Sequence, residues 1–329
     1  MSGALDGFYT TPDLPFNALD YGVRAEFGTI IPPGGRVFYV RGNGTSTTEY
    51  GYDPPGMRER LIPSVATALS YCVAGRGDVI YVLEGHTENV SAAASWSSLV
   101  TNVKIIGRGE SVARPVFTFS AATSQIIVSK ANVTMANCNW LAAGPAGTTA
   151  ITVAAPFSIT ASGFKFIGND VEVGVDADQL CTNFMALVTA ATDCRFGQNT
   201  VHAGPLSAVT TVLKTTGAMD RLKIYGNRIS APVTTAATGV LIDVSNAALI
   251  DNDIINNHLA NTTASSKFVI KPHATSTGYV DGNRYYTGDG ATAPAVSAWS
   301  TFTTTYQHGQ NYCVTTTAVS GLLCPAADA

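Results

Sequence analysis

The sequence has few charged side chains: 13% of its 329 residues are Asp, Glu, Lys or Arg, whereas 46% are hydrophobic. That hydrophobic share can bury a sizeable core, and the surface must then be covered mainly by uncharged Thr, Ser, Asn and Gly. The formal net charge is −4, so there is no general positive field to attract phosphate backbones or anionic lipids. We therefore expect neither nucleic acid nor a membrane as a partner.

Signals for export and membrane insertion are also lacking. Residues 1–10 have neither a basic stretch nor the continuous apolar run that a secretory signal peptide requires. No window approaches the ~20 apolar residues that a membrane-spanning helix needs. We expect a soluble protein without a signal peptide.

The six cysteines form neither a disulfide-rich scaffold nor the CxxC spacing of a metal site. We expect buried, unpaired thiols at the central positions. Cys313 and Cys324 lie close together near the chain end, where a disulfide that closes the terminal loop is an open alternative.

An internal repeat is the most informative feature that is present. Six segments align without gaps, and each reads as a short strand, a polar turn and a second short strand: 133–140, 159–166, 189–196, 222–229, 247–254 and 278–285. Their last positions are spaced by 26, 30, 33, 25 and 31 residues. Each spacing accommodates three strands of about five residues with turns between them. The pattern predicts an all-β, single-stranded parallel β-helix with loop insertions between its coils.

Two columns of this alignment predict stacked side chains. The last column holds large groups that we expect to form an inward-facing ladder: Trp140, Phe166, Phe196, Ile229, Ile254 and Tyr285. The column two residues earlier changes from apolar residues to asparagine: Cys138, Phe164, Cys194, Asn227, Asn252 and Asn283. Parallel coils lie ~4.8 Å apart, so the asparagine amides can form a structural hydrogen-bonded ladder. Cys138 and Cys194 would then lie two coils apart, too far for a disulfide.

The ends of such a stack need caps. Residues 62–74 predict a capping helix, because Val65, Ala68, Leu69 and Cys72 recur at helical spacing after Ser64. We divide the chain into an N-terminal arm or anchor (1–60), the β-helix with its capping helix (61–290) and a C-terminal cap or association segment (291–329). Because the arm carries many aromatic residues, we expect it to dock on a partner or along the helix body.

After the capping helix, the order of motifs resembles a known family. Gly77 to Val82 reads Gly-Asp-Val-Ile-Tyr-Val, and Glu84-Gly-His-Thr-Glu-Asn-Val90 follows it, then Val103-Lys-Ile-Ile-Gly-Arg-Gly109. This resembles the start of the right-handed parallel β-helix in the pectate-lyase-like superfamily. With Arg114-Pro-Val-Phe-Thr-Phe119 and Ala131-Asn-Val-Thr-Met135, the chain is similar to β-helical structural proteins of tailed bacteriophages. The resemblance covers roughly Phe38 to Phe166, and it implies a right-handed helix and a homotrimer.

Residues that could perform chemistry are sparse. The nearest acidic cluster is Asp170, Glu172, Asp176 and Asp178. It is a candidate metal site, and the alternative is a solvated loop. Arg221-Leu-Lys223 faintly resembles the Arg-Ile-Lys of pectin-degrading hydrolases but lacks their accompanying motifs. Asp251 and Asp253 could project outward as a pair, although turn and ladder roles explain them equally well. His86, flanked by Glu84 and Glu88, fits a structural hydrogen bond.

These features predict a non-enzymatic structural protein of a tailed-phage virion, made in the host cytoplasm, with a capsid decoration protein favoured. We expect no cofactor and no catalytic residues. The expected partners are other virion proteins and further copies of the chain. The alternative is a tailspike-like carbohydrate-active enzyme, or a receptor module that binds a host surface glycan on the same fold.

Overall fold

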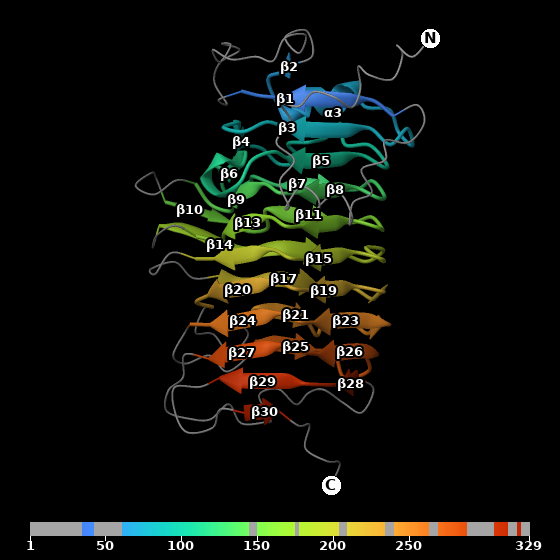
Figure 1. The fold of residues 1–329 in the computed structure, drawn as a ribbon, viewed down its shortest axis with the longest axis vertical. Coiled ribbons are helices and arrows are strands. Elements are labelled where there is room, and N and C mark those ends of the chain that lie inside the picture. Colours follow the sequence, from blue (N-terminus) through green and yellow to red (C-terminus); the bar gives the residue numbers. More distant parts are fainter. Residues whose placement is uncertain are drawn as a thin grey trace, which may run out of the picture.

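The structure, a computed structural model, describes residues 35–42, 61–144, 150–174, 178–203, 209–233, 240–262, 269–287, 306–314 and 321–323. These ranges form an all-β chain wound into a parallel β-solenoid of about seven turns. Figure 1 shows the coils stacked along the long axis, with N-terminal strands in blue at one end and C-terminal strands in red at the other. The predicted parallel β-helix is therefore confirmed.

Three sheets form the described stack, because most coils contribute one strand to each sheet in turn. Sheet A has the order β2 (Leu61–Ile62), β1 (Val37–Val40), β3 (Val79–Val82), β5 (Lys104–Gly107), β8 (Thr134–Ala136), β12 (Lys165–Ile167), β15 (Arg195–Gly197), β19 (Lys223–Tyr225), β23 (Asn252–Ile255), β26 (Gly278–Asp281) and β28 (Tyr306–His308). Sheet B has the order β4 (Thr87–Val90), β6 (Val116–Phe119), β9 (Asn139–Leu141), β13 (Asp170–Glu172), β16 (Thr200–His202), β20 (Arg228–Ala231), β24 (His258–Asn261), β27 (Arg284–Thr287), β29 (Asn311–Val314) and β30 (Gly321–Leu323).

Sheet C is shorter. Its strands are β7 (Ile126–Val128), β11 (Phe157–Ile159), β14 (Gln179–Leu187), β17 (Val209–Thr215), β21 (Ile242–Val244) and β25 (Ile270–Pro272), with β10 (Ile151–Val153) also paired to β14. Two short strands, β18 (Met219–Asp220) and β22 (Leu249–Ile250), pair separately, and a 3-10 turn spans Ser111–Ala113. The described strand pairs are parallel, apart from β29 with β30.

The core lies inside the coils because strand alternation points every second side chain inward. Its aromatic side chains stack from one coil to the next. The rings of Phe166 and Phe196 lie 5.6 Å apart and nearly parallel, and those of Phe117 and Trp140 are 4.7 Å apart. Such pairs add about 0.5–1.5 kcal/mol each beyond the area they bury.

The capping helix predicted over 62–74 is confirmed as α3 (Val65–Tyr71), which is three residues shorter at each end, and Ile62 belongs to β2 instead. Ser64 is its N-cap, with its Oγ accepting a hydrogen bond from the Thr67 amide at 3.1 Å, and Val65, Ala68 and Leu69 are buried. Strands β1 and β2 lie beyond β3 at this end of sheet A, so part of the first sixty residues belongs to the coil stack. At the other end, β28 and β29 continue sheets A and B past residue 290.

The predicted ladder of large side chains is wrong in its register. All six side chains are buried, but they divide between two sheets. Phe166, Phe196 and Ile254 stack in sheet A, whereas Trp140, Ile229 and Tyr285 belong to sheet B. The column that pairs in sheet A is Met135, Phe166, Phe196, Ile224, Ile254 and Val280, with spacings of 31, 30, 28, 30 and 26 residues. The aligned segments that end at Trp140, Ile229 and Tyr285 were therefore displaced by five residues relative to the column of sheet A.

An asparagine ladder follows the corner between sheets A and B through six consecutive coils. Its members are Asn169, Asn199, Asn227, Asn257, Asn283 and Asn311. From Asn169 to Asn283, each Nδ2 donates to the Oδ1 of the next asparagine and to a carbonyl of the preceding coil; for Asn227 these distances are 2.9 Å and 2.8 Å. The Nδ2 of Asn311, the last member, donates to Val280 O. At the N-terminal end, Cys138 replaces asparagine, and Trp140 Nε1 donates to Asn169 Oδ1 at 3.1 Å.

The prediction of this ladder was correct for Asn227 and Asn283 and wrong for Asn252. The Asn252 side chain lies at the corner before sheet A, where it accepts from the Leu222 amide at 3.0 Å. The same displacement had placed Cys138 and Cys194 in one column; they occupy different corners. The residue before five of the six ladder asparagines has a left-handed backbone, as at Gly168, Gln198 and Gly226 with φ of 65°, 54° and 62°. A Gly, Gln or Asn followed by Asn is therefore the signal that marks this corner.

Candidate functional site

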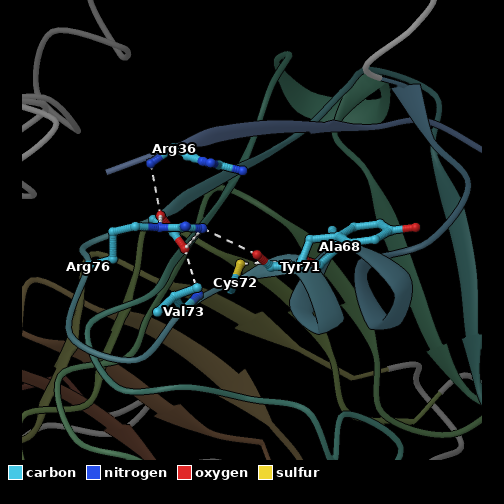
Figure 2. Close-up of polar contacts among 7 residues, drawn as sticks. Arg36, Ala68, Tyr71, Cys72, Val73 and Arg76 are labelled. Carbon is cyan, nitrogen blue, oxygen red and sulfur yellow. Dashed lines mark hydrogen bonds and ion pairs between the residues drawn. The ribbon is translucent and has the colours of Figure 1, made fainter. Parts of the chain in front are cut away.

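The most strongly bonded buried carboxylate is Asp78, which lies beneath the capping helix at the start of the stack. Arg76 donates to it from Nε at 2.6 Å and from Nη2 at 2.7 Å. The backbone amides of Arg36 and Val73 each donate at 2.8 Å. Figure 2 shows these groups converging from three segments that precede or flank β3. Asp78 therefore joins β1, the end of α3 and β3.

The charge of Asp78 is retained by these bonds. Burial alone would raise its pKa, but the hydrogen bonds from Arg76, Val73 and Arg36 outweigh burial and lower the pKa below its ordinary value of 3.8. The carboxylate has four donors and 1% exposure, so its chemistry is structural.

His86 and Glu88 form a second buried cluster at the same end. The Gly42 amide donates to His86 Nδ1 at 2.9 Å, so the ring proton lies on Nε2, which is 3.1 Å from Glu88 Oε2. Glu88 also accepts from the Val65 amide at 2.7 Å and from Trp96 Nε1 at 3.3 Å. The predicted structural hydrogen bond of His86 is confirmed, and Glu84 is exposed on the surface instead.

The structure does not gather the acidic residues of the candidate metal site. Asp170 and Glu172 flank the buried Val171 on β13 and face outward from sheet B, whereas Asp178 precedes β14 of sheet C. Asp176 lies outside the described residues. Among the residues that the structure describes, no three His, Cys, Asp or Glu side chains stand close enough to hold a metal ion.

Asp170 instead faces His202 on the neighbouring strand β16, with Oδ1 3.4 Å from Nδ1. We expect His202→Gln to lower the melting temperature most at about pH 5, with a loss below about 1 kcal/mol because both groups are partly exposed. The close approach of the two side chains raises the pKa of His202 above 6.5 and lowers that of Asp170 below 3.8. The charged pair is lost as pH rises through the raised pKa of His202 or falls through the lowered pKa of Asp170. Thermal melts at about pH 5 and about pH 8 measure this, and equal losses at both would contradict it.

The predicted unpaired thiols are confirmed at Cys72, Cys138, Cys181 and Cys194, which are all free and buried. Of the possible Cys313–Cys324 disulfide, Cys313 lies on β29 and Cys324 lies outside the described residues. Burial raises the pKa of Cys138 and Cys194 to about 12 and that of Cys181 further. These thiols are therefore poor nucleophiles in the folded protein.

We expect iodoacetamide to leave Cys138, Cys181 and Cys194 unmodified in the native protein at about pH 7.5, because the thiolate is the reacting form. Denatured protein treated for the same time should be fully labelled. Peptide mass spectrometry reports each cysteine separately, and labelling of any of the three before unfolding would contradict the prediction.

Arg221 and Lys223 take part in ion pairs between coils. Arg221 makes two bonds to Asp193 at 2.5 Å and 2.8 Å, and Lys223 Nζ lies 2.8 Å from Asp253 Oδ2. Asp251 is exposed at a left-handed corner position. Asp251 and Asp253 therefore do not act as an outward acidic pair, because Asp251 lies in a turn and Asp253 forms an ion pair with Lys223.

The outer face of sheet A carries a row of cations that sequence analysis missed. Lys104, Lys165, Arg195 and Lys223 occupy one paired column, with Thr134 between the first two. Burial, and then the charge of Lys165, lower the pKa of Lys104. A pocket of about 330 Å³ opens beside this row and is lined by Gly75, Gly77, Asn102, Lys104, Asn132, Thr134, Gly163 and Lys165. The displaced alignment hid the row because it mixed positions from sheets A and B.

The fold and these clusters define a parallel β-solenoid whose buried polar groups hold its coils and its N-terminal cap together. No helix in the described part of the chain is long and apolar enough to span a membrane. A scan of known protein families finds no match to the chain, and neither do searches of curated proteins and of solved structures.

Proposed function

We propose that the chain is a non-enzymatic structural protein of a tailed-phage virion, displayed on the head surface as a decoration protein. The observation that carries the proposal is the unbroken asparagine ladder from Asn169 to Asn311, which bonds six consecutive coils into one rigid body. Fully bonded buried polar networks of this kind make a structure rigid.

The motifs that resemble phage β-helical proteins support the same proposal. Asp78, His86 and Glu88 belong to these motifs, and their side chains bond to the backbone of Arg36, Gly42 and Val65. In this role they seal the N-terminal end of the stack. A sealed, rigid rod with few charges suits a protein that remains on the outside of a particle.

The test is to locate the protein on purified particles. We expect mass spectrometry to detect it in particles after density-gradient purification, and an epitope tag to be labelled on the head surface in electron micrographs. Absence from purified particles would overturn the proposal, and labelling confined to the tail would move the protein to the alternative location.

A second candidate function is recognition of a host surface glycan, which the pocket beside Lys104 and Lys165 favours. Its lysine, asparagine and threonine side chains can donate hydrogen bonds to sugar hydroxyls and acidic groups. Glycan-array binding that Lys165→Gln weakens and Lys130→Gln leaves unchanged would support a receptor module. Release of reducing ends from a host polysaccharide would instead indicate a tailspike-like enzyme, and no binding would exclude both.

A further inference from the structure

A second row of basic side chains lies on the outer face of sheet B. Arg228, His258 and Arg284 occupy the first positions of β20, β24 and β27 and pair directly in register. The residues that follow them, Ile229, Leu259 and Tyr285, are buried, so by alternation the three basic side chains face outward. All three are exposed. In Figure 1 these strands follow one another near the C-terminal end.

This row is not explained by the packing of the described coils. Among the described residues, none of the three side chains takes part in an ion pair or a side-chain hydrogen bond. The chain as a whole is acidic, with a net charge of −4. The two arginines, one on each side of His258, therefore concentrate positive charge on one short stretch of surface.

The chemistry and shape of this face indicate the kind of ligand. A guanidinium fork binds carboxylates in a bidentate geometry, and the two arginines stand two strand spacings, about 10 Å, apart. The residues beside them on the same face are Ser230, Ala260 and the half-buried Tyr286. Sites for small molecules are concave, whereas protein interfaces are flat and enriched in arginine and tyrosine. The exposed Tyr312 continues the row on β29.

We propose that the outer face of β20, β24 and β27 docks an acidic surface of a partner protein, with carboxylates bound by Arg228 and Arg284 and the His258 ring between them. The inference rests on the proposed function in that a surface component of a particle must dock on other proteins. The inference specifies the face that docks and the negative charge that the partner presents.

The experiment measures binding of a fluorescent oligoglutamate peptide to the full-length chain at low ionic strength by anisotropy. We expect the double variant Arg228→Gln, Arg284→Gln to weaken binding about tenfold, as the loss of two exposed charge contacts implies. The double variant Lys130→Gln, Lys271→Gln removes the same charge elsewhere and should bind as the native chain does. Arg228→Lys with Arg284→Lys keeps the charge without the forks and should give an intermediate loss. Unchanged thermal melts confirm that each variant is folded.

Three outcomes would overturn the proposal: no binding of oligoglutamate to the native chain, an equal loss in the Lys130 and Lys271 control, or binding of a heparin-derived oligosaccharide but not of the peptide. The last would make the ligand a glycan. The docking face and the virion role can fail independently of each other. Arginine variants that stay on particles at native occupancy would overturn this docking face while leaving the virion role intact. A chain absent from particles that still binds oligoglutamate through the two arginines would leave the docking face and remove the virion role.

Discussion

Replacement of Asn227 by alanine should destabilise the protein by about 3–5 kcal/mol, because one side chain satisfies four buried groups. Asn227 Oδ1 accepts from the backbone amide and from Nδ2 of Asn199, both at 3.0 Å, and its own Nδ2 donates to Phe196 O and Asn257 Oδ1. Alanine removes all four bonds from the buried ladder, so Asn257 Oδ1 keeps only the bond from the backbone amide of residue 227 and Asn199 Nδ2 keeps only the bond to Phe166 O. Chemical denaturation followed by circular dichroism measures the loss as a shift of the unfolding midpoint.

Asn246→Ala is the matched control. Its side chain also bonds a carbonyl of a neighbouring coil, Thr216 O at 2.6 Å, but Asn246 is exposed, so water replaces the lost partner. We expect a loss of less than about 1 kcal/mol there. Similar losses for the two variants would show that the ladder does not hold the coils together.

Asp78→Asn should open the N-terminal end of the stack at a cost of about 3–5 kcal/mol, because a buried charged partner is removed from Arg76 and two backbone amides. The amide side chain has a single acceptor oxygen, so it cannot satisfy the donors of Arg36, Val73 and Arg76 together. Hydrogen exchange should accelerate first in β1 and α3, the segments that Asp78 joins. Amide exchange followed by mass spectrometry locates that change.

The pH dependence of this loss has a definite sign. The pKa of Asp78 is lowered in the folded state, so its stabilisation is complete above 3.8 and is lost as pH falls through the lowered value. The difference between the native chain and the variant should therefore disappear only in strong acid. Asp193→Asn removes an exposed Asp–Arg pair with Arg221 and should cost less than about 1 kcal/mol. An equal loss at both sites, or faster exchange throughout the stack, would contradict the prediction.

The amino-acid sequence predicted the coil but not which coil positions face one another. In each repeat, a strand of sheet A and the next strand of sheet B both place a large apolar residue after a polar one, as Lys165-Phe166 and Asn139-Trp140 do. The two patterns are locally identical, so an ungapped alignment exchanged them in three of six repeats. The loops between coils absorb length differences, and spacing alone could not correct the error.

Local chemistry determined the features that the sequence alone revealed: the burial of the six large side chains, the start of the capping helix at Ser64, the unpaired thiols and the structural role of His86. These depend on alternation and on side-chain type, which act over a few residues. Only the tertiary structure decided which groups meet, such as Asp78 with an amide 42 positions away, or Arg228 with His258 and Arg284. The physical reason is that coil lengths vary from 26 to 31 residues, so contacts between coils depend on backbone pairing that no short pattern specifies.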